Sequence, residues 1–318
     1  MKSRSLGVDI LKTILAMMIV GLHTGVMVEY GHSLNYFFSS GIFRLAVPIF
    51  FLISGYFFCR VNSFGGLKHW GIRLLYLFLF WNTLFILVYL TSSPTIELRK
   101  ILLFIFVGYH HLWYVQAMFI AGILLYVFKF VFHQSDNRLL LFSMVLYVVG
   151  AVLQYMLRFN VLNLGISESH SVHLLYRNGL FFAFPFFCLG YYLKSKNIRG
   201  IPLHWFFVSI ILFITEVYLC IKFMNPLKGI EMHLALYPLS SILFLYVINT
   251  ITGTYSTVKI DIGKLSSCVF FIHPLFIVVG KSNNLIGVNL FVFTYVFSLL
   301  LAYFVIIPIQ RKYLSFIL

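Results

Sequence analysis

Charge is scarce in this sequence, and negative charge is scarcer still. Asp, Glu, Lys and Arg make up 10% of the 318 residues, and only 8 residues are acidic. Soluble domains carry about 25% charged and roughly 45–50% apolar residues, whereas this chain is 61% hydrophobic. A globular fold of this length cannot bury so much apolar surface. The composition therefore excludes a soluble enzyme, a disordered chain and a secreted disulfide scaffold, and it predicts a polytopic membrane protein.

Several sequence signatures of chemistry are also missing. The four cysteines lie in or beside apolar runs without CxxC spacing, so they predict small buried side chains rather than disulfides or metal ligands. There is no P-loop, no Gly-rich dinucleotide fingerprint, no HExxH and no GxSxG. The 23 Lys and Arg residues form short clusters between apolar runs, which is typical of loops beside membrane spans. We expect no metal, no permanently bound cofactor and no nucleic-acid partner.

Apolar runs of the length that crosses a bilayer, about 20 residues, recur along the chain. Ten windows qualify, of which the sixth and ninth are short: 6–28, 41–59, 71–91, 112–132, 139–157, 177–193, 204–224, 233–252, 266–280 and 287–309. The predicted fold is an all-α bundle of about ten transmembrane helices. We expect residues 1–318 to form a single membrane domain in the lipid bilayer, without a soluble domain.

The distribution of basic residues predicts the orientation of this bundle. With the N-terminus in the cytoplasm, fourteen Lys and Arg lie on the cytoplasmic side, seven on the opposite side and two inside spans. An excess of basic residues marks the cytoplasmic side of membrane proteins. The count favours an even number of spans with both termini in the cytoplasm. An odd number would place the basic residues Arg311 and Lys312 outside.

The first span contains three ionisable residues, which are costly in a membrane unless paired or hydrated. Asp9 and Lys12 are three residues apart and therefore neighbours on one helical face. Lys12 and His23 are eleven apart, which returns to nearly the same face roughly 16 Å further along. One helix would thus present a cation near the cytoplasmic side and an imidazole in the outer half. The alternative is a snorkelling lysine and a hydrogen-bonded core histidine.

Other polar residues gather on the predicted outer side. Arg44 lies in the outer half of the second span, and His111 and Arg177 open the fourth and sixth spans. Ionisable residues at such positions are candidates for a functional site. For Arg44 the alternative is pairing with Glu29 or a lipid phosphate, and for His111 it is an interfacial position beside Trp113.

Two further ionisable residues lie within spans. His273 precedes Pro274, whose ring frees a backbone carbonyl one turn back. We expect His273 to have a structural role, hydrogen-bonded at a kink. Glu216, in the seventh span, has no evident partner in the sequence.

The stretch Gly7–Lys12, running on to His23, resembles the opening helix of the membrane-bound acyltransferase-3 family. That helix has an Asp followed by a basic residue, ten intervening residues and a His; the basic residue is usually Arg, here Lys12. Other resembling stretches follow in the family's order over almost the whole chain: Phe50–Tyr56, Arg73, His111–Val115, Arg177–Leu180, Pro185–Phe187, Leu189–Tyr191 and Ile272–Leu275.

The resemblance implies an integral O-acyltransferase of a bacterial inner membrane. It would move an acetyl or other acyl group from cytoplasmic acyl-CoA, such as acetyl-CoA, to a sugar hydroxyl of a lipid-linked or cell-surface glycan. His23 would accept the hydroxyl proton or carry the acyl group as a nucleophile, with Asp9 and Lys12 on the same helix completing the catalytic set.

The resemblance also assigns the two substrates to residues. The acceptor and the oxyanion would be bound by Arg44, His111, Trp113 and Arg177. The phosphates of the donor would be bound by Lys12 and Arg73. The rival interpretation is a transporter or exporter of a glycan or small acyl compound, because interior charges also mark substrate pathways. No internal repeat typical of transporters is visible in the sequence.

Overall fold

The computed structural model describes residues 3–92, 96–159, 161–162, 172–223, 229–256 and 261–312. Each of the ten predicted windows forms a helix. These are α1 (Leu6–Thr24), α3 (Ala46–Phe58), α4 (Phe64–Ser92), α6 (Trp113–Tyr126), α7 (Asp136–Arg158), α8 (Phe184–Ser195), α9 (Leu203–Phe223), α10 (Leu236–Thr250), α11 (Ile262–Ser282) and α12 (Gly287–Leu301). The all-α prediction is confirmed.

Short elements complete the described structure. They are the helices α2 (His32–Tyr36), α5 (Leu98–Val107) and α13 (Ile307–Lys312), and the strands β1 (Ser3–Ser5) and β2 (Thr254–Ser256). The two strands pair antiparallel, with Arg4 opposite Tyr255. This small sheet is the one departure from helix among the regular elements of the described ranges, and it ties the N-terminus to the α10–α11 connection.

The predicted count of ten spans is supported only in part. Eight helical segments of the described chain are long and apolar enough to cross a membrane, so the chain is a multi-pass membrane protein. The windows 177–193 and 233–252 instead form α8 and α10, which have 12 and 15 residues. A π-helical turn, Gly179–Ala183, runs directly into α8 and extends it. The ninth window, although short in the sequence, lies within the 21-residue helix α11.

The second segment begins earlier than its apolar window indicates. Helical turns continue from His32 to Phe58 over 27 residues. In the middle, a π-helical turn (Phe37–Gly41) is followed by a 3-10 turn (Ile42–Leu45). Such irregular turns frequently mark functional positions in helices, and this one carries Arg44.

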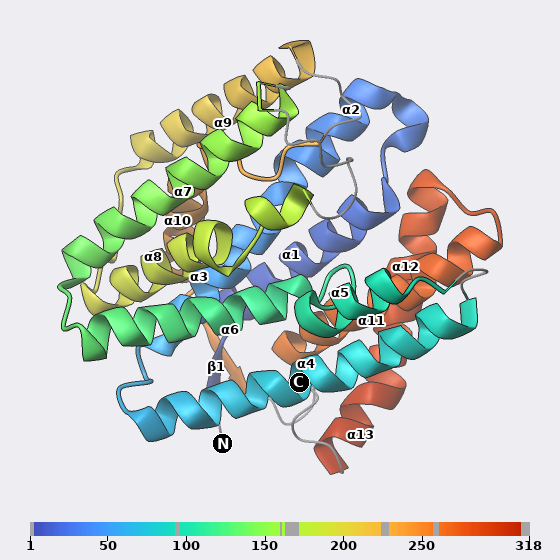
Figure 1. Ribbon diagram of the computed structural model, residues 1–318, viewed down its shortest axis with the longest axis horizontal. Helices are drawn as coiled ribbons and strands as arrows, with labels where there is room; N and C mark the ends of the chain where they lie inside the picture. Colours follow the sequence, from blue (N-terminus) through green and yellow to red (C-terminus); the bar gives the residue numbers. More distant parts are fainter. Residues whose placement is uncertain are drawn as a thin grey trace.

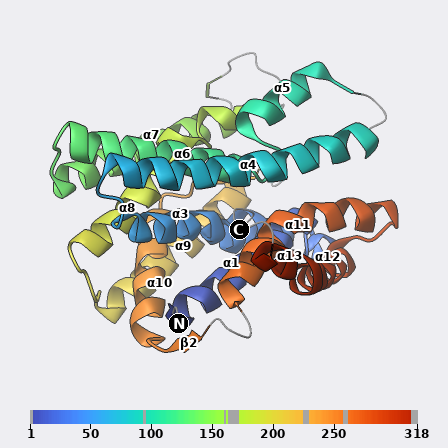
Figure 2. The same ribbon diagram turned by 90° about the horizontal axis from the view of Figure 1, so that it is seen from below.

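The helices are arranged in layers. Figure 2 shows α4, α6 and α7 on one side, α3 and α8 beneath them, and α1, α10 and α12 beyond. At the centre α3 and α8 cross in backbone contact. A Cβ added to Gly55 would lie 1.9 Å from the Phe187 carbonyl oxygen, and one added to Gly190 would lie 2.0 Å from the Leu52 carbonyl oxygen. The crossing therefore requires glycine on both helices.

The connections between helices form two groups at opposite ends of the molecule. Figure 1 shows the α6–α7 and α8–α9 connections at the left edge and the α11–α12 connection at the right edge. We call the end with residues 25–31, 108–112, 172–178, 229–235 and 283–286 the site face, and the end with 59–63, 132–135, 196–202 and 251–256 the opposite face.

Contacts between distant loops support this division. On the site face, the Val288 N–H donates to Glu29 Oε2 at 3.2 Å. On the opposite face, Asp136 pairs with Lys129 at 2.5 Å and with Lys196 at 3.9 Å. The described loops thus lie on two opposite faces of the molecule. Which face is cytoplasmic stays a prediction.

Candidate active site

Three imidazoles meet near the site face. His23 on α1 and His273 on α11 have ring centroids 5.3 Å apart, and the ring of His111 lies 5.4 Å from that of His273. His273 is fully buried and His111 almost so, whereas the side chain of His23 is exposed. We call these residues the imidazole cluster. His23 is the solvent-accessible member of the cluster, and His111 and His273 are its buried members.

The sequence of α11 fixes the orientation of His273. Pro274 has no N–H, so the carbonyl of Phe270 lacks its usual helical donor. The Nδ1–H of His273 donates to that carbonyl at 2.7 Å. The expected hydrogen bond of His273 is confirmed, and it has a chemical consequence. With Nδ1 protonated, Nε2 carries the lone pair, and this buried atom has no hydrogen-bond partner among the residues that the structure describes.

His111 is placed by the turn that links α5 to α6. Asn82 of α4 holds both ends of this turn: its Nδ2 donates to the Phe104 carbonyl at 2.7 Å, and its Oδ1 accepts from the Tyr109 N–H at 3.0 Å. Gly108, with φ of +96°, ends α5 in a conformation that favours glycine. Neither ring nitrogen of His111 makes a hydrogen bond of normal geometry, although the backbone of Phe271 lies close.

Beside the imidazoles lies a cluster of charged groups around one carboxylate. Glu231 Oε1 is 2.9 Å from Arg177 Nη1, 3.4 Å from Arg44 Nη1 and 3.5 Å from His173 Nδ1. Its backbone N–H donates to Gln154 Oε1 at 2.9 Å. We call Glu231, Arg44, Arg177 and His173 the Glu231 cluster. It joins the 3-10 turn before α3, the loop before α8 and the loop before α10.

The charges in this cluster are well defined. Burial raises the pKa of Glu231, but Arg177 and Arg44 lower it more, so that the pKa falls to about 2. Burial lowers the pKa of His173 to about 4. At neutral pH the cluster therefore contains a carboxylate, two guanidinium groups and a neutral imidazole. The second oxygen, Glu231 Oε2, has no hydrogen-bond partner within the described ranges.

The imidazole cluster and the Glu231 cluster belong to one site. His23 lies within electrostatic range of Arg44, Arg177 and His110 as well as His273. The guanidinium carbon of Arg177 is 5.0 Å from the ring centroid of Trp113, a cation–π contact that orients it. The structure thus places the imidazole of His23 within electrostatic range of two cationic groups.

The structure brings together the residues predicted for the acceptor and the oxyanion. It places Arg44, His111, Trp113 and Arg177 in the same part of the molecule as His23, and their roles stay predictions. Arg44 pairs with Glu231 rather than with Glu29, so the alternative of a Glu29 pair is wrong. Glu231 was missed, although it is one of only 8 acidic residues and directly precedes an apolar window.

The other predicted residues lie elsewhere. Asp9 is buried in the first turn of α1, and Lys12 is half-buried eleven residues before His23, roughly 16 Å along the helix. Arg73 is exposed on α4. The structure does not bring these residues to the imidazole cluster, and their roles stay predictions.

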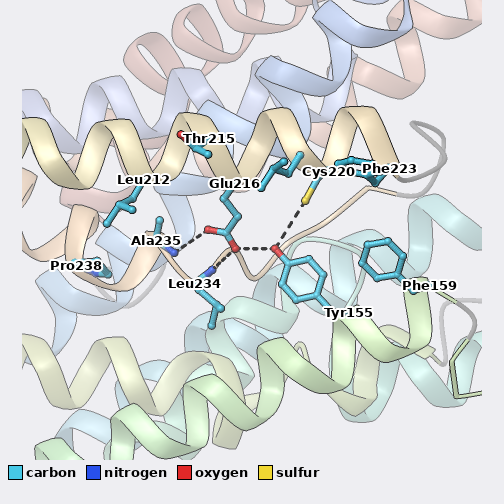
Figure 3. A pocket seen from close by; sticks show the side chains of 11 residues that line it. Tyr155, Phe159, Leu212, Thr215, Glu216, Cys220, Phe223, Leu234, Ala235 and Pro238 are labelled. Atoms are coloured by element: carbon cyan, nitrogen blue, oxygen red, sulfur yellow. Dashed lines mark hydrogen bonds between the residues drawn. The ribbon is translucent and has the colours of Figure 1, made fainter.

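Glu216 has a structural explanation. Its carboxylate accepts from the Tyr155 hydroxyl at 2.7 Å and from the backbone N–H groups of Leu234 and Ala235 at 2.7 and 2.9 Å (Figure 3). Those N–H groups lie at the start of α10, where helix donors lack partners. Glu216 therefore caps α10 from the neighbouring helix α9, on the wall of an apolar pocket of about 590 Å³.

Side chains that bind metal ions are not clustered in the described part of the molecule. Within the described ranges, no group of three His, Cys, Asp or Glu side chains is arranged to hold a metal ion.

The fold and the site together define a multi-pass helical membrane protein with a histidine-containing polar site near one face. This chain belongs to the acyltransferase 3 family, whose acyltransferase domain matches residues 5–310. It is similar to two amino-acid racemases of Enterococcus faecalis, each 29% identical: one over 304 residues, 89% of this chain and 42% of the relative, the other over 218 residues, 61% and 28%. The chain spans less than half the length of these relatives. No solved structure matches it.

Proposed function

We propose that this protein is an integral-membrane O-acyltransferase that moves an acetyl group from acetyl-CoA to a hydroxyl of a cell-surface or lipid-linked glycan. The observation that carries the proposal is the imidazole cluster, in which the accessible His23 stands against the oriented ring of His273. A thioester is already activated, so the enzyme has to deprotonate an alcohol and stabilise an oxyanion. Histidine suits proton transfer near neutral pH.

The proposed reaction uses His23 as the proton acceptor. The sugar hydroxyl loses its proton to His23 as its oxygen attacks the thioester carbonyl. The tetrahedral oxyanion then faces the guanidinium groups of Arg44 and Arg177, whose charge Glu231 only partly neutralises. When the C–S bond breaks, the coenzyme A thiolate takes the proton from His23. His273 Nε2, which no donor of the described residues occupies, would accept a hydrogen bond from the protonated ring of His23.

The donor is proposed to reach this site along α1 from the opposite face. Lys12 and Arg73 would bind its phosphates, Lys12 as a compact charge partway along the helix. Lys12→Arg keeps the charge and is expected to retain substantial activity, whereas Lys12→Met is expected to raise the KM for acetyl-CoA far more than the KM for the acceptor. Equal effects of both variants on the two KM values would place the donor site elsewhere.

Acetyl transfer by the purified protein tests the proposed function. The protein in lipid nanodiscs, without any gradient, is incubated with radiolabelled acetyl-CoA and a glycan extract, and label in the glycan is counted. His23→Ala is expected to lower the rate by about 10²–10⁴-fold, the usual contribution of a proton acceptor. His32→Ala is the matched control, because His32 is exposed at the start of α2 on the same face.

Two results would contradict the proposal. The first is a His23→Ala rate above about a tenth of the parent rate, given that expected range. The second is no transfer at all by the intact parent protein while vesicles containing it move a glycan or acyl compound across the membrane, which is the behaviour of a transporter. The bacterial inner membrane is the proposed location, since it gives access to both acetyl-CoA and lipid-linked glycans.

A further inference from the structure

The apolar pocket of about 590 Å³ lies between α7 and α9, at the start of α10 (Figure 3). Pockets that bind small molecules are roughly 300–1,000 Å³, so it has the size of a ligand site. We call it the α7–α9 pocket. The proposed transfer reaction does not use it.

The polar groups on the wall of this pocket bond to one another. Glu216 accepts hydrogen bonds from the Tyr155 hydroxyl and from two backbone N–H groups at the start of α10. The same hydroxyl is 3.8 Å from the Cys220 sulfur. Apart from Thr215, the remaining lining residues are aliphatic, aromatic or proline. Because a polar ligand would lose its hydrogen bonds to water against such a wall, the pocket suits a hydrocarbon chain.

The pocket is open along one side. Leu212, Leu219 and Phe223 of α9 line it, and these residues are 54, 45 and 64% exposed. Both wall helices, α7 and α9, are long and apolar enough to cross a membrane. The open side therefore faces the hydrocarbon of the bilayer, and a ligand enters the pocket from the lipid.

The length of the pocket matches one leaflet of a bilayer. Phe159 and Phe223 line it at the ends of α7 and α9 that reach the site face. Leu212 lies eleven residues before Phe223, roughly 16 Å along α9, and the hydrocarbon core of a bilayer is about 30 Å thick. The pocket thus extends from the site face to about the middle of the membrane, as a lipid chain does.

A cationic group lies at the end of the pocket on the site face. Lys222 is exposed, and its Nζ is 5.3 Å from the ring centroid of Phe223, which lines the pocket. Long basic side chains near helix ends extend to the level of the lipid head groups. An ammonium group binds phosphate as a compact charge, so this end of the pocket suits the phosphate of a lipid.

The same end of the pocket adjoins the Glu231 cluster. Tyr155 directly follows Gln154, whose side chain accepts from the Glu231 N–H at 2.9 Å. Phe159 directly follows Arg158, which acts electrostatically on Glu231. The head group of a lipid whose chain fills the pocket therefore lies beside the candidate active site.

We infer that the α7–α9 pocket binds the hydrocarbon chain of a lipid-linked acceptor, with the lipid phosphate at Lys222 and the glycan on the site face. The inference rests on the proposed function and deepens it, because it assigns the acceptor to the lipid-linked glycans. A lipid chain gains little by exchanging one apolar medium for another. The pocket therefore acts by holding the lipid in one position, which orients the attached glycan for transfer.

Photocrosslinking tests the inference without relying on transfer. The purified protein in phosphatidylcholine nanodiscs is irradiated with geranylgeranyl phosphate that carries a benzophenone at the end of its chain, and labelled peptides are identified by mass spectrometry. We expect saturable label on the stretches of α7 and α9 that line the pocket. Unlabelled geranylgeranyl phosphate is expected to compete for the site, whereas phosphatidylglycerol at the same mole fraction is not.

Two variants with matched controls connect the label to the pocket. Leu219→Trp places a larger side chain in the pocket and is expected to weaken probe binding about fivefold or more, as overpacking of a filled site does. Ile211→Trp is its control, because Ile211 is exposed on the same helix outside the pocket lining. Lys222→Gln is expected to weaken binding roughly two- to fivefold, the range of an exposed charge pair. Lys281→Gln, at an exposed lysine on the same face, is expected to leave binding unchanged.

The outcomes separate this inference from the proposed function. Label spread evenly over the lipid-facing helices, equal competition by phosphatidylglycerol, or unchanged binding to Leu219→Trp would overturn the inference. In the transfer assay, Leu219→Trp is expected to raise the KM for a lipid-linked acceptor and to leave the KM for acetyl-CoA unchanged. Saturable label in the pocket without any transfer by the parent contradicts the proposed function alone. Transfer to a lipid-free glycan with the same KM as to the lipid-linked glycan contradicts the inference alone.

Discussion

Replacing Pro274 by alanine tests whether a single backbone carbonyl orients the imidazole of His273 in the candidate active site. The substitution restores an N–H at position 274, and in an α-helix this group bonds to the carbonyl of Phe270. That carbonyl now accepts from His273 Nδ1 at 2.7 Å. The restored N–H competes with His273 Nδ1 for the Phe270 carbonyl. The imidazole of His273 therefore loses the hydrogen bond that fixes its orientation.

The expected size of the effect follows from this one hydrogen bond. A hydrogen bond in a folded protein contributes about 0.5–1.5 kcal/mol net, which corresponds to roughly a 2- to 12-fold change in the population of the correct ring orientation. We expect the rate of acetyl transfer to fall by the same factor, with both KM values unchanged. Proline inside a helix costs about 3 kcal/mol, so we expect thermal stability to stay the same or rise.

The assay combines initial rates of transfer with thermal unfolding of the same preparations. Pro238→Ala is the matched control, because Pro238 lies in the first turn of α10, where a missing N–H leaves no partner unsatisfied. Its rate should equal that of the parent. A Pro274→Ala protein with the parent rate would show that the His273–Phe270 bond plays no part in transfer. A loss of rate together with a loss of stability would assign the effect to the shape of α11 instead.

Glu231→Gln is expected to destabilise the fold at pH 7. Burial raises the pKa of Glu231 but the arginines lower it more, from 4.5 to about 2, so its stabilisation is complete above about pH 4.5 and is lost as the pH falls towards 2. Thermal unfolding should therefore show a gap between parent and variant that narrows below about pH 4.5 and closes only near pH 2; a gap independent of pH would refute the assignment. In a cysteine-free background, Ser33→Cys should react with an impermeant maleimide in intact spheroplasts, and Asn62→Cys only after permeabilisation; the reverse pattern would invert the predicted orientation. Gly55→Ala should cost about 3 kcal/mol or more through overlap with a carbonyl of α8, whereas Gly65→Ala, in open space, should leave the melting temperature unchanged.

The helices could be predicted because their signal is local. A run of apolar side chains and the 3.6-residue period depend only on neighbouring residues, and each of the ten windows became a helix. Hydropathy does not reveal where helical geometry stops. The helices α8 and α10 are therefore shorter than the apolar windows that predicted them. The second helical segment begins at His32, among residues too polar to extend its apolar window.

The site could be predicted only as a group of residues at one end of the bundle. The even alternation of spans predicts that His23, Arg44, His111 and Arg177 lie at the same end, and the structure brings these side chains close together, while their roles stay predictions. The identity of their partners depends on contacts between distant loops, which one sequence does not record. Glu231 lies in the connection before α10, whereas Arg44 lies in the 3-10 turn before α3 and Arg177 in the loop before α8.

The role of His273 illustrates the same limit. The freed carbonyl at Pro274 was predictable from the helical period, and the hydrogen bond to it is confirmed. The position of the His273 ring beside His23 depends on how α1 packs against α11. The helical period of each sequence segment does not determine that packing.

The glycine crossing of α3 and α8 has a consequence for how substrates enter. Arg44 lies directly before α3, and Arg177 lies directly before the π-helical turn that continues into α8. Because the two backbones are in contact at Gly55 and Gly190, the crossing fixes the position of one helix relative to the other and with it the separation of the two guanidinium groups. The guanidinium groups cannot move apart unless the two helices separate. The ten-residue helix α5, whose side chains are mostly exposed, lines a cavity of about 370 Å³ beside Arg177 and takes no part in this crossing, so we expect a bulky acceptor of the proposed reaction to enter past α5.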